Sequence, residues 1–130
     1  MNLVDTSGWV EYFFEGSNAG FFADAIEDTQ ELLVPVICIY EVFKKVSLVA
    51  TDELAFHTVA QMEHGRIVNI TEPIALSAAG ISIKHKLPMA DSLILSCART
   101  HDAILWTQDS HFHNLPGVRY KKASKSKSKK

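Results

Sequence analysis

The feature that most constrains the fold of this chain is the alternation of short apolar segments with longer amphipathic ones. The apolar segments lie at 2–5, 32–34, 67–70 and 103–106, and the stretches between them have the apolar spacing of helices. Strands that are apolar throughout must be covered on both faces, which is typical of a parallel sheet between two layers of helix. The sequence therefore predicts a three-layer α/β fold with a mainly parallel central sheet flanked by helices.

Helices are predicted for the segments between these strands. The first follows Thr6-Ser7, a typical helix-capping pair. Gly65 is expected to end the helix before it in the usual position just past the last turn. The remaining predictions are helices at 19–29, 36–50, 52–64, 72–86 and 89–100, with 118–120 as a candidate fifth strand.

Length and composition fit one globular domain. The chain has 130 residues, 47% of them apolar, which suits a single hydrophobic core. The longest apolar run, 32–40, is too short to cross a bilayer, and the N-terminal segment lacks the basic residues of a signal peptide. Cys38 and Cys97 stand apart in apolar surroundings and are expected to be buried thiols in a reducing compartment. We therefore expect a cytoplasmic protein without membrane association.

The charges are distributed unevenly along the chain. Residues 1–118 hold six basic and fifteen acidic residues, a net charge of −9, whereas residues 119–130 hold seven basic residues and no acid. This division predicts one domain over residues 1–120 and a basic, disordered tail over 121–130. The tail is interpreted either as an arm that contacts the phosphates of RNA or as a solvated end that keeps the protein soluble.

Four acidic residues stand where apolar or neutral ones would be expected, or where strands end. Asp5 and Asp109 follow predicted strands, and ligands of open parallel sheets bind beyond the carboxyl ends of the strands. Glu41 and Asp91 interrupt apolar stretches of predicted helices. Each acid taken singly has a structural explanation, as a helix cap, a helix-dipole partner, an ion pair of Glu41 with Lys45, or a turn.

Taken together, the four acids favour a metal site. Four carboxylates in one crevice would repel one another unless a cation lay between them. Hard divalent cations such as Mg²⁺ or Mn²⁺ prefer oxygen ligands, and they can activate water and neutralise charge on a phosphodiester. The sequence places each acid where such convergence is possible.

The same residues carry a resemblance to a known family. The chain resembles PIN domains, and among them the VapC toxins of bacterial toxin–antitoxin pairs, from residue 1 to about residue 120. The matching pieces are the opening Leu3-Val4-Asp5-Thr6-Ser7, the helix with Glu41, the segment Met89–Leu95 around Asp91, and the turn from Leu105 to Phe112 around Asp109. Their order and spacing make the resemblance more specific than any single piece.

The resemblance implies an acidic metal site made by Asp5, Glu41, Asp91 and Asp109. It suggests that the hydroxyls of Thr6, Ser7 and Thr107 position carboxylates or water. Members of this family are typically Mg²⁺- or Mn²⁺-dependent endoribonucleases that cut single-stranded or loop RNA. They commonly form homodimers and are held inactive by a cognate antitoxin that inserts into the active site.

The chain departs from the family pattern at one position. Many relatives carry a second acid two residues after the one matched by Asp109, and here that residue is His111. A histidine is a softer ligand with a variable charge, so this departure puts a second metal position in doubt. His111 and His113 also form a His-x-His pair, which is weak evidence for zinc.

Other residues have a structural and a functional interpretation. Trp9 and Trp106 are candidates for stacking on bases in an RNA-binding protein, but their apolar surroundings favour the core. The candidate phosphate contacts are equally well explained as solvated helix faces, and they are Lys44, Lys45, Lys84, Lys86 and Arg99.

The function predicted from the sequence is metal-dependent hydrolysis of RNA phosphodiester bonds, as the toxin of a type II toxin–antitoxin pair. Asp5, Glu41, Asp91 and Asp109 would bind one or two Mg²⁺ or Mn²⁺ ions, and an activated water would attack phosphorus in line. The main alternative is a non-catalytic PIN-like module that binds RNA or a partner protein. A related DNA nuclease fits less well because the chain is short, and a nucleotide-binding protein is disfavoured because no glycine-rich loop follows a strand.

Overall fold

The computed structural model describes residues 1–124 and contains one sheet of five parallel strands over that range. The strand order is β3-β2-β1-β4-β5, so the first strand of the sequence lies in the middle of the sheet. The strands are β1 (Asn2–Val4), β2 (Leu32–Pro35), β3 (Arg66–Val68), β4 (Ile104–Thr107) and β5 (Val118–Tyr120). Residues 125–130, which belong to the predicted basic tail, lie outside the described residues.

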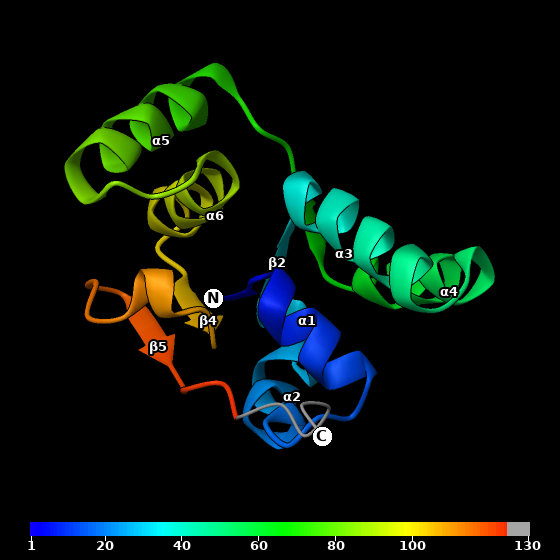
Figure 1. The fold of residues 1–130 in the computed structure, drawn as a ribbon. Coiled ribbons are helices and arrows are strands. Elements are labelled where there is room, and N and C mark those ends of the chain that lie inside the picture. The colour runs from blue at the N-terminus through cyan, green and yellow to red at the C-terminus, as the bar shows by residue number, and fades with distance from the viewer. Residues whose placement is uncertain (125–130) are drawn as a thin grey trace.

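Six α-helices of the described range flank this sheet. They are α1 (Thr6–Phe13), α2 (Ala19–Glu27), α3 (Val36–Val49), α4 (Asp52–Met62), α5 (Glu72–His85) and α6 (Met89–Thr100). Figure 1 shows α5 and α6 together on one side of the sheet and α1 and α2 on the other, with α3 packed against α1 and α4 packed against α3. The predicted three-layer α/β fold is confirmed, and every strand pair is parallel. Among residues 1–124, no helix is both long and apolar enough to span a bilayer.

The core lies on both faces of the central strands. Leu3 of β1 is paired in register with Leu33 of β2 on one side and with Leu105 of β4 on the other, and all three are fully buried. Trp9 and Trp106 are buried as predicted, as are the free thiols of Cys38 and Cys97. The apolar character of these strands therefore reflects cover from both helical layers.

The path of the chain creates a crevice at the carboxyl end of β1. From β1 the chain passes through α1 and α2 to β2, whereas β4 on the other side of β1 is reached only after β3, α5 and α6. The connections leaving β1 and β4 therefore run in opposite directions along the sheet. Ligands of open parallel sheets bind where the connections diverge in this way.

The structure corrects several local predictions. Thr6 and Ser7 are not the cap of α1, because Asp5 holds the N-cap position and its side chain accepts a hydrogen bond from the Gly8 amide. Helix α1 ends at Phe13, and Phe14, which follows it as the C-cap, is 43% exposed. The third strand is Arg66–Val68 and not 67–70, and the helix predicted to reach residue 64 ends at Met62.

Gly65 has a different role from the one predicted. It lacks the positive φ of a helix-ending glycine. A Cβ atom at this position would lie 2.9 Å from Val34 Cγ2 and 3.0 Å from the Leu32 carbonyl oxygen. The glycine therefore allows the turn between α4 and β3 to pass close to β2, where a larger side chain would meet these atoms.

Gly8 is a second position of close approach, and it lies next to the crevice. A Cβ atom there would lie 2.5 Å from Val4 Cγ1 and 2.6 Å from Phe22 Cδ1, both of which belong to fully buried side chains. We expect Gly8→Ala to lower the free energy of unfolding by about 1–3 kcal/mol, because a packed core resists an added methyl group. Urea unfolding followed by circular dichroism measures this change.

The matched control is Gly80→Ala in α5, where an added Cβ meets no atom within 4 Å. Alanine is the better helix former, so this variant should raise the free energy of unfolding by about 0.5–1 kcal/mol. Equal stability of the two variants would contradict the close packing of Gly8.

Candidate active site

An open pocket of about 540 Å³ lies over the crevice at the carboxyl end of β1. All four acids singled out in the sequence line it, together with hydroxyl, lysine and apolar side chains. The lining residues are Asp5, Thr6, Ser7, Val10, Glu11, Tyr40, Glu41, Lys44, Lys45, Leu48, Asp91, Ile94, Gln108 and Asp109. Four carboxylates that are distant in the sequence therefore share one pocket.

Asp5 lies deepest in this group, with only 3% of its surface exposed. Its Oδ1 accepts hydrogen bonds from Ser7 Oγ at 2.7 Å and from the Gly8 amide at 3.0 Å. Its Oδ2 accepts a hydrogen bond from Thr107 Oγ1 at 2.6 Å, which ties the end of β1 to the end of β4. These three donors fix both oxygens of the carboxylate.

Burial dominates the electrostatics of Asp5. It raises the pKa of the carboxyl from 3.8 to about 6, although the hydrogen bonds from Thr107, Ser7 and Gly8 act in the opposite direction. The negative charge of Asp109 also raises this pKa. A cation nearby would stabilise the charged form of this buried carboxylate, because its three hydrogen bonds do not fully compensate for its burial.

Glu41 reaches the pocket from the middle of α3. Its Oε1 accepts a hydrogen bond from Thr6 Oγ1 at 2.6 Å, so the first residue of α1 holds the carboxylate of α3. Burial is the largest cause of a raised pKa of the nearby Cys38 thiol, and the negative charges of Asp5 and Glu41 raise this pKa further. Thr6, Ser7 and Thr107 each donate a hydrogen bond to one of the pocket carboxylates.

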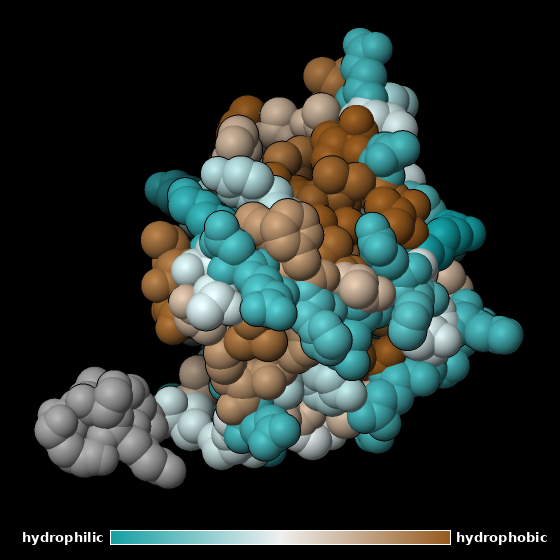
Figure 2. All heavy atoms as spheres, turned by 90° about the vertical axis from the view of Figure 1, so that its right-hand side faces the viewer, coloured by the Kyte–Doolittle hydropathy of each residue, from teal (hydrophilic) through white to brown (hydrophobic). Residues whose placement is uncertain are grey.

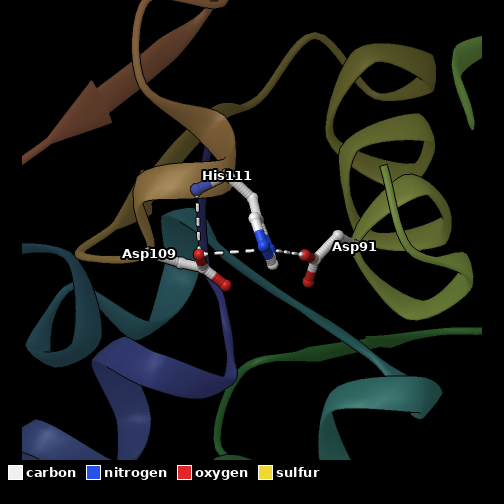
Figure 3. Close-up of side chains that lie close together, drawn as sticks. All are labelled: Asp91, Asp109 and His111. Carbon is white, nitrogen blue, oxygen red and sulfur yellow. Dashed lines mark hydrogen bonds and ion pairs between the residues drawn. The ribbon is translucent and has the colours of Figure 1, made fainter. Parts of the chain in front are cut away.

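Asp91, Asp109 and His111 form a cluster of possible metal ligands beside the pocket (Figure 3). His111 Nδ1 lies 2.8 Å from Asp91 Oδ2 and 3.3 Å from Asp109 Oδ1. Asp91 stands in the first turn of α6, whereas Asp109 and His111 belong to a 3-10 turn, η2 (Ser110–Phe112), and its cap. Figure 3 shows the imidazole between the two carboxylates, which approach it from opposite sides.

The charges of this cluster are coupled to the rest of the pocket. Burial is the largest cause of a raised Asp91 pKa, and the charges of Asp109 and Glu41 raise it further, against the hydrogen bond with His111. The hydrogen bond with Asp91 raises the pKa of His111, and the charge of Asp109 adds to this effect. The carboxylates therefore act on one another, as expected of acids gathered in one place.

The donor set suits a divalent cation. One ligand atom each from Asp91, Asp109 and His111 lies within 4.8 Å of the others, close enough for all three to contact the same ion. Asp5 and Glu41 line the same pocket but are not part of this group of three. The arrangement thus offers two carboxylates and an imidazole at short range, with two further carboxylates in the same pocket.

Sequence reasoning missed a polar network at the rim of the pocket. Gln108 Nε2 donates a hydrogen bond to Glu11 Oε1 at 3.4 Å. The side chain of the buried Asn18 donates to Gln108 Oε1 at 2.9 Å, and its backbone amide donates to Glu11 Oε2 at 2.7 Å. Glu11 follows Ser7 by four residues on α1, and this helical spacing was the one available signal.

The candidate phosphate contacts and His113 differ in their position relative to the pocket. Lys44 and Lys45 line the pocket, whereas Lys84, Lys86 and Arg99 are not among its lining residues. His113 stacks on the Tyr120 ring, with the two ring centres 4.6 Å apart, and does not join the cluster of His111. Within residues 1–124, the lysine side chains that line this pocket are therefore both on α3.

Comparison with protein families gives a match over almost the whole described chain. The family model described as PIN domain matches residues 3–118. A search of curated proteins gave no match. The family match covers all four pocket acids.

Solved structures of low sequence identity share the fold. A toxin–antitoxin complex from Klebsiella pneumoniae has 24% identity and a TM-score of 0.76, over 92% of this chain and 96% of that one. The sarcin–ricin loop cleaving toxin VapC20 of Mycobacterium tuberculosis has 13% identity and a TM-score of 0.71, over 86% and 92%. DNA-bound VapBC of Salmonella typhimurium has 14% identity and a TM-score of 0.72, over 94% and 98%.

The raised pKa of Asp5 predicts a pH dependence of stability in the absence of metal. The folded protein binds this proton more tightly than the unfolded chain, so the contribution of Asp5 to stability is largest at low pH. It is lost as the pH rises from 3.8 towards the folded pKa of about 6. The loss should reach about 2–3 kcal/mol in wild type. Urea unfolding in EDTA between pH 4.5 and 7.5 measures it.

Comparison of wild type with Asp5→Asn isolates this contribution, because the neutral amide does not titrate. Asp24→Asn, which alters an exposed acid of α2, should follow the wild-type pH profile. If the free energy of unfolding changed with pH in the same way for wild type and Asp5→Asn, the prediction would be contradicted.

Proposed function

This chain belongs to the PIN domain family, and from that premise we propose that it is a divalent-metal-dependent endoribonuclease, the toxin of a type II toxin–antitoxin pair acting in the cytoplasm. The observation that carries this proposal is the meeting of Asp5, Glu41, Asp91 and Asp109 in one pocket. They come from the end of β1, the middle of α3, the first turn of α6 and the turn after β4. We propose these four as the catalytic, metal-holding residues, with Mg²⁺ or Mn²⁺ as the ion.

Each element of the pocket has a part in this proposal. A bound divalent cation supplies an activated water and neutralises charge that develops on the phosphodiester. The donors Thr6, Ser7 and Thr107 hold the carboxylates in fixed orientations, so little reorganisation is needed when substrate binds. Lys44 and Lys45 on the pocket wall would contact RNA phosphates.

The test is cleavage of an RNA panel with single-stranded and loop substrates. We expect wild type to cut RNA with Mg²⁺ or Mn²⁺ and to lose activity in EDTA. Asp5→Asn and Glu41→Gln should each lower the cleavage rate by at least about 100-fold, because each removes a charge that the ion and the transition state need. The rates are measured by gel analysis of end-labelled RNA.

The matched control is Asp24→Asn, the same chemical change on an exposed acid of α2 outside the pocket, which should keep the wild-type rate. Cleavage that persists in EDTA, or in Asp5→Asn at the wild-type rate, would overturn the proposal. RNA binding without cleavage under any metal would favour the alternative, a non-catalytic RNA- or protein-binding module.

We also propose an antitoxin as partner, bound along an apolar groove between α3 and α4. The groove is lined by Ile39, Tyr40, Phe43, Lys44, Ser47, Leu48, Asp52, Phe56 and Val59. Figure 2 looks onto the side of the molecule that carries these helices and shows apolar side chains gathered over a wide area. Tyr40, Lys44 and Leu48 line both this groove and the acidic pocket. A segment seated in the groove would therefore reach the pocket, and the similar toxin–antitoxin complexes support such a partner.

Phe56→Asp tests this groove, because Phe56 is 66% exposed and does not line the acidic pocket. We expect this variant to cut RNA at the wild-type rate. Its affinity for the cognate antitoxin should fall by about 30-fold or more, as expected for an aromatic anchor of an interface. Titration calorimetry measures the affinity, and cleavage with added partner measures the inhibition.

Ile83→Asp is the control, because Ile83 is 80% exposed on α5 and outside the groove. It should bind the partner as wild type does. A Phe56→Asp protein that is inhibited as strongly as wild type would contradict the assignment of the groove. The expected homodimer is a separate proposal, measured by light scattering of the isolated protein.

A further inference from the structure

The imidazole of His111 lies between the carboxylates of Asp91 and Asp109. Its Nδ1 atom lies 2.8 Å from an oxygen of Asp91 and 3.3 Å from an oxygen of Asp109, from two separate elements of the fold (Figure 3). The side chain is 55% exposed, so it is accessible to solvent. A nitrogen ligand therefore stands beside two carboxylates that can hold a metal ion.

We propose that His111 is a metal ligand and that it makes this site select first-row transition-metal ions over Mg²⁺. The inference rests on the proposed metal-dependent function and deepens it, because it identifies which class of divalent ion the site prefers. A chain with a third carboxylate in place of His111 would offer only oxygen ligands here.

The turn that carries His111 is held by hydrogen bonds before this residue and by a buried side chain after it. The His111 amide donates to Asp109 Oδ1 at 2.9 Å, and the Asp109 amide donates to Thr107 Oγ1 at 2.9 Å. The next side chain, Phe112, is fully buried and anchors η2 to the core. The backbone of His111 is thus held in place, and its imidazole remains within reach of Asp91 and Asp109.

Ligand chemistry explains the expected selectivity. Mg²⁺ binds oxygen ligands and retains much of its water, so it gains little from an imidazole. Transition-metal ions bind imidazole well, with affinities that generally rise from Mn²⁺ to Co²⁺ and Ni²⁺. Replacement of a carboxylate by His111 also removes one negative charge from the site, which weakens a hard ion most.

A purely structural role for His111 makes the opposite prediction. If the imidazole only neutralised Asp91 and Asp109 as an ion-pair partner, it would compete with every cation. Its removal would then raise the affinity for Mg²⁺ and Co²⁺ alike. The sign of the change in Co²⁺ affinity therefore separates a ligand from a competitor.

The experiment is titration calorimetry of the full chain with Mg²⁺, Mn²⁺ and Co²⁺ as probes. We expect wild type to bind Co²⁺ at least about 10-fold more tightly than Mg²⁺. His111→Asn should lower Co²⁺ affinity by about 10-fold or more and change Mg²⁺ affinity by less than about 3-fold. His111→Asp should shift the preference back towards Mg²⁺. The visible absorption of bound Co²⁺ should change in both variants, because a nitrogen ligand is lost.

His113→Asn is the matched control, because His113 stacks on Tyr120 outside the cluster, and it should keep the wild-type ratio of Co²⁺ to Mg²⁺ affinity. Circular dichroism confirms the fold of each variant. Unchanged or increased Co²⁺ affinity in His111→Asn overturns the inference, and if wild type still cuts RNA with Mg²⁺, the proposed function stands. If wild type binds none of the three ions and cuts no RNA, both fail.

Discussion

The buried carboxylate of Asp5 is the contact on which the site depends. It caps α1 through the Gly8 amide and receives hydroxyl hydrogen bonds from Ser7 at the start of that helix and from Thr107 at the end of β4. Three segments are therefore joined at one side chain. The direction in which α1 leaves the sheet, and with it the position of Thr6 beside Glu41, follows from this junction.

The structural and the functional interpretations of these acids are compatible. Asp5 is a helix cap, Asp91 lies in the first turn of a helix, and Asp109 accepts a hydrogen bond from the His111 amide in a tight turn. Each of these local roles orients a carboxylate without consuming all of its lone pairs. Local hydrogen bonding thus prepares the side chains for a shared ligand, and a cap or turn is no argument against a site.

The sequence predicted the parts of the molecule that follow from periodicity, and it missed those that depend on contact between distant segments. Apolar strands and helical spacing were sufficient for the layers, and the position of Asp5 after a strand was sufficient to place it at the crevice. The network of Glu11, Asn18 and Gln108 could not be predicted, because it joins α1, the following loop and the end of β4. The position of His111 between two carboxylates depends on the shape of η2. The need for a glycine at position 65 comes from the side chains and backbone of β2.

The lengths of the outer strands limit how this protein can associate. β3 and β5 form the two borders of the sheet, and each has only three residues. Borders this short present few unpaired backbone amides and carbonyls to a strand from another molecule. Growth of the sheet from one molecule into the next is therefore disfavoured, and contacts between molecules fall to the side chains of the helical layers.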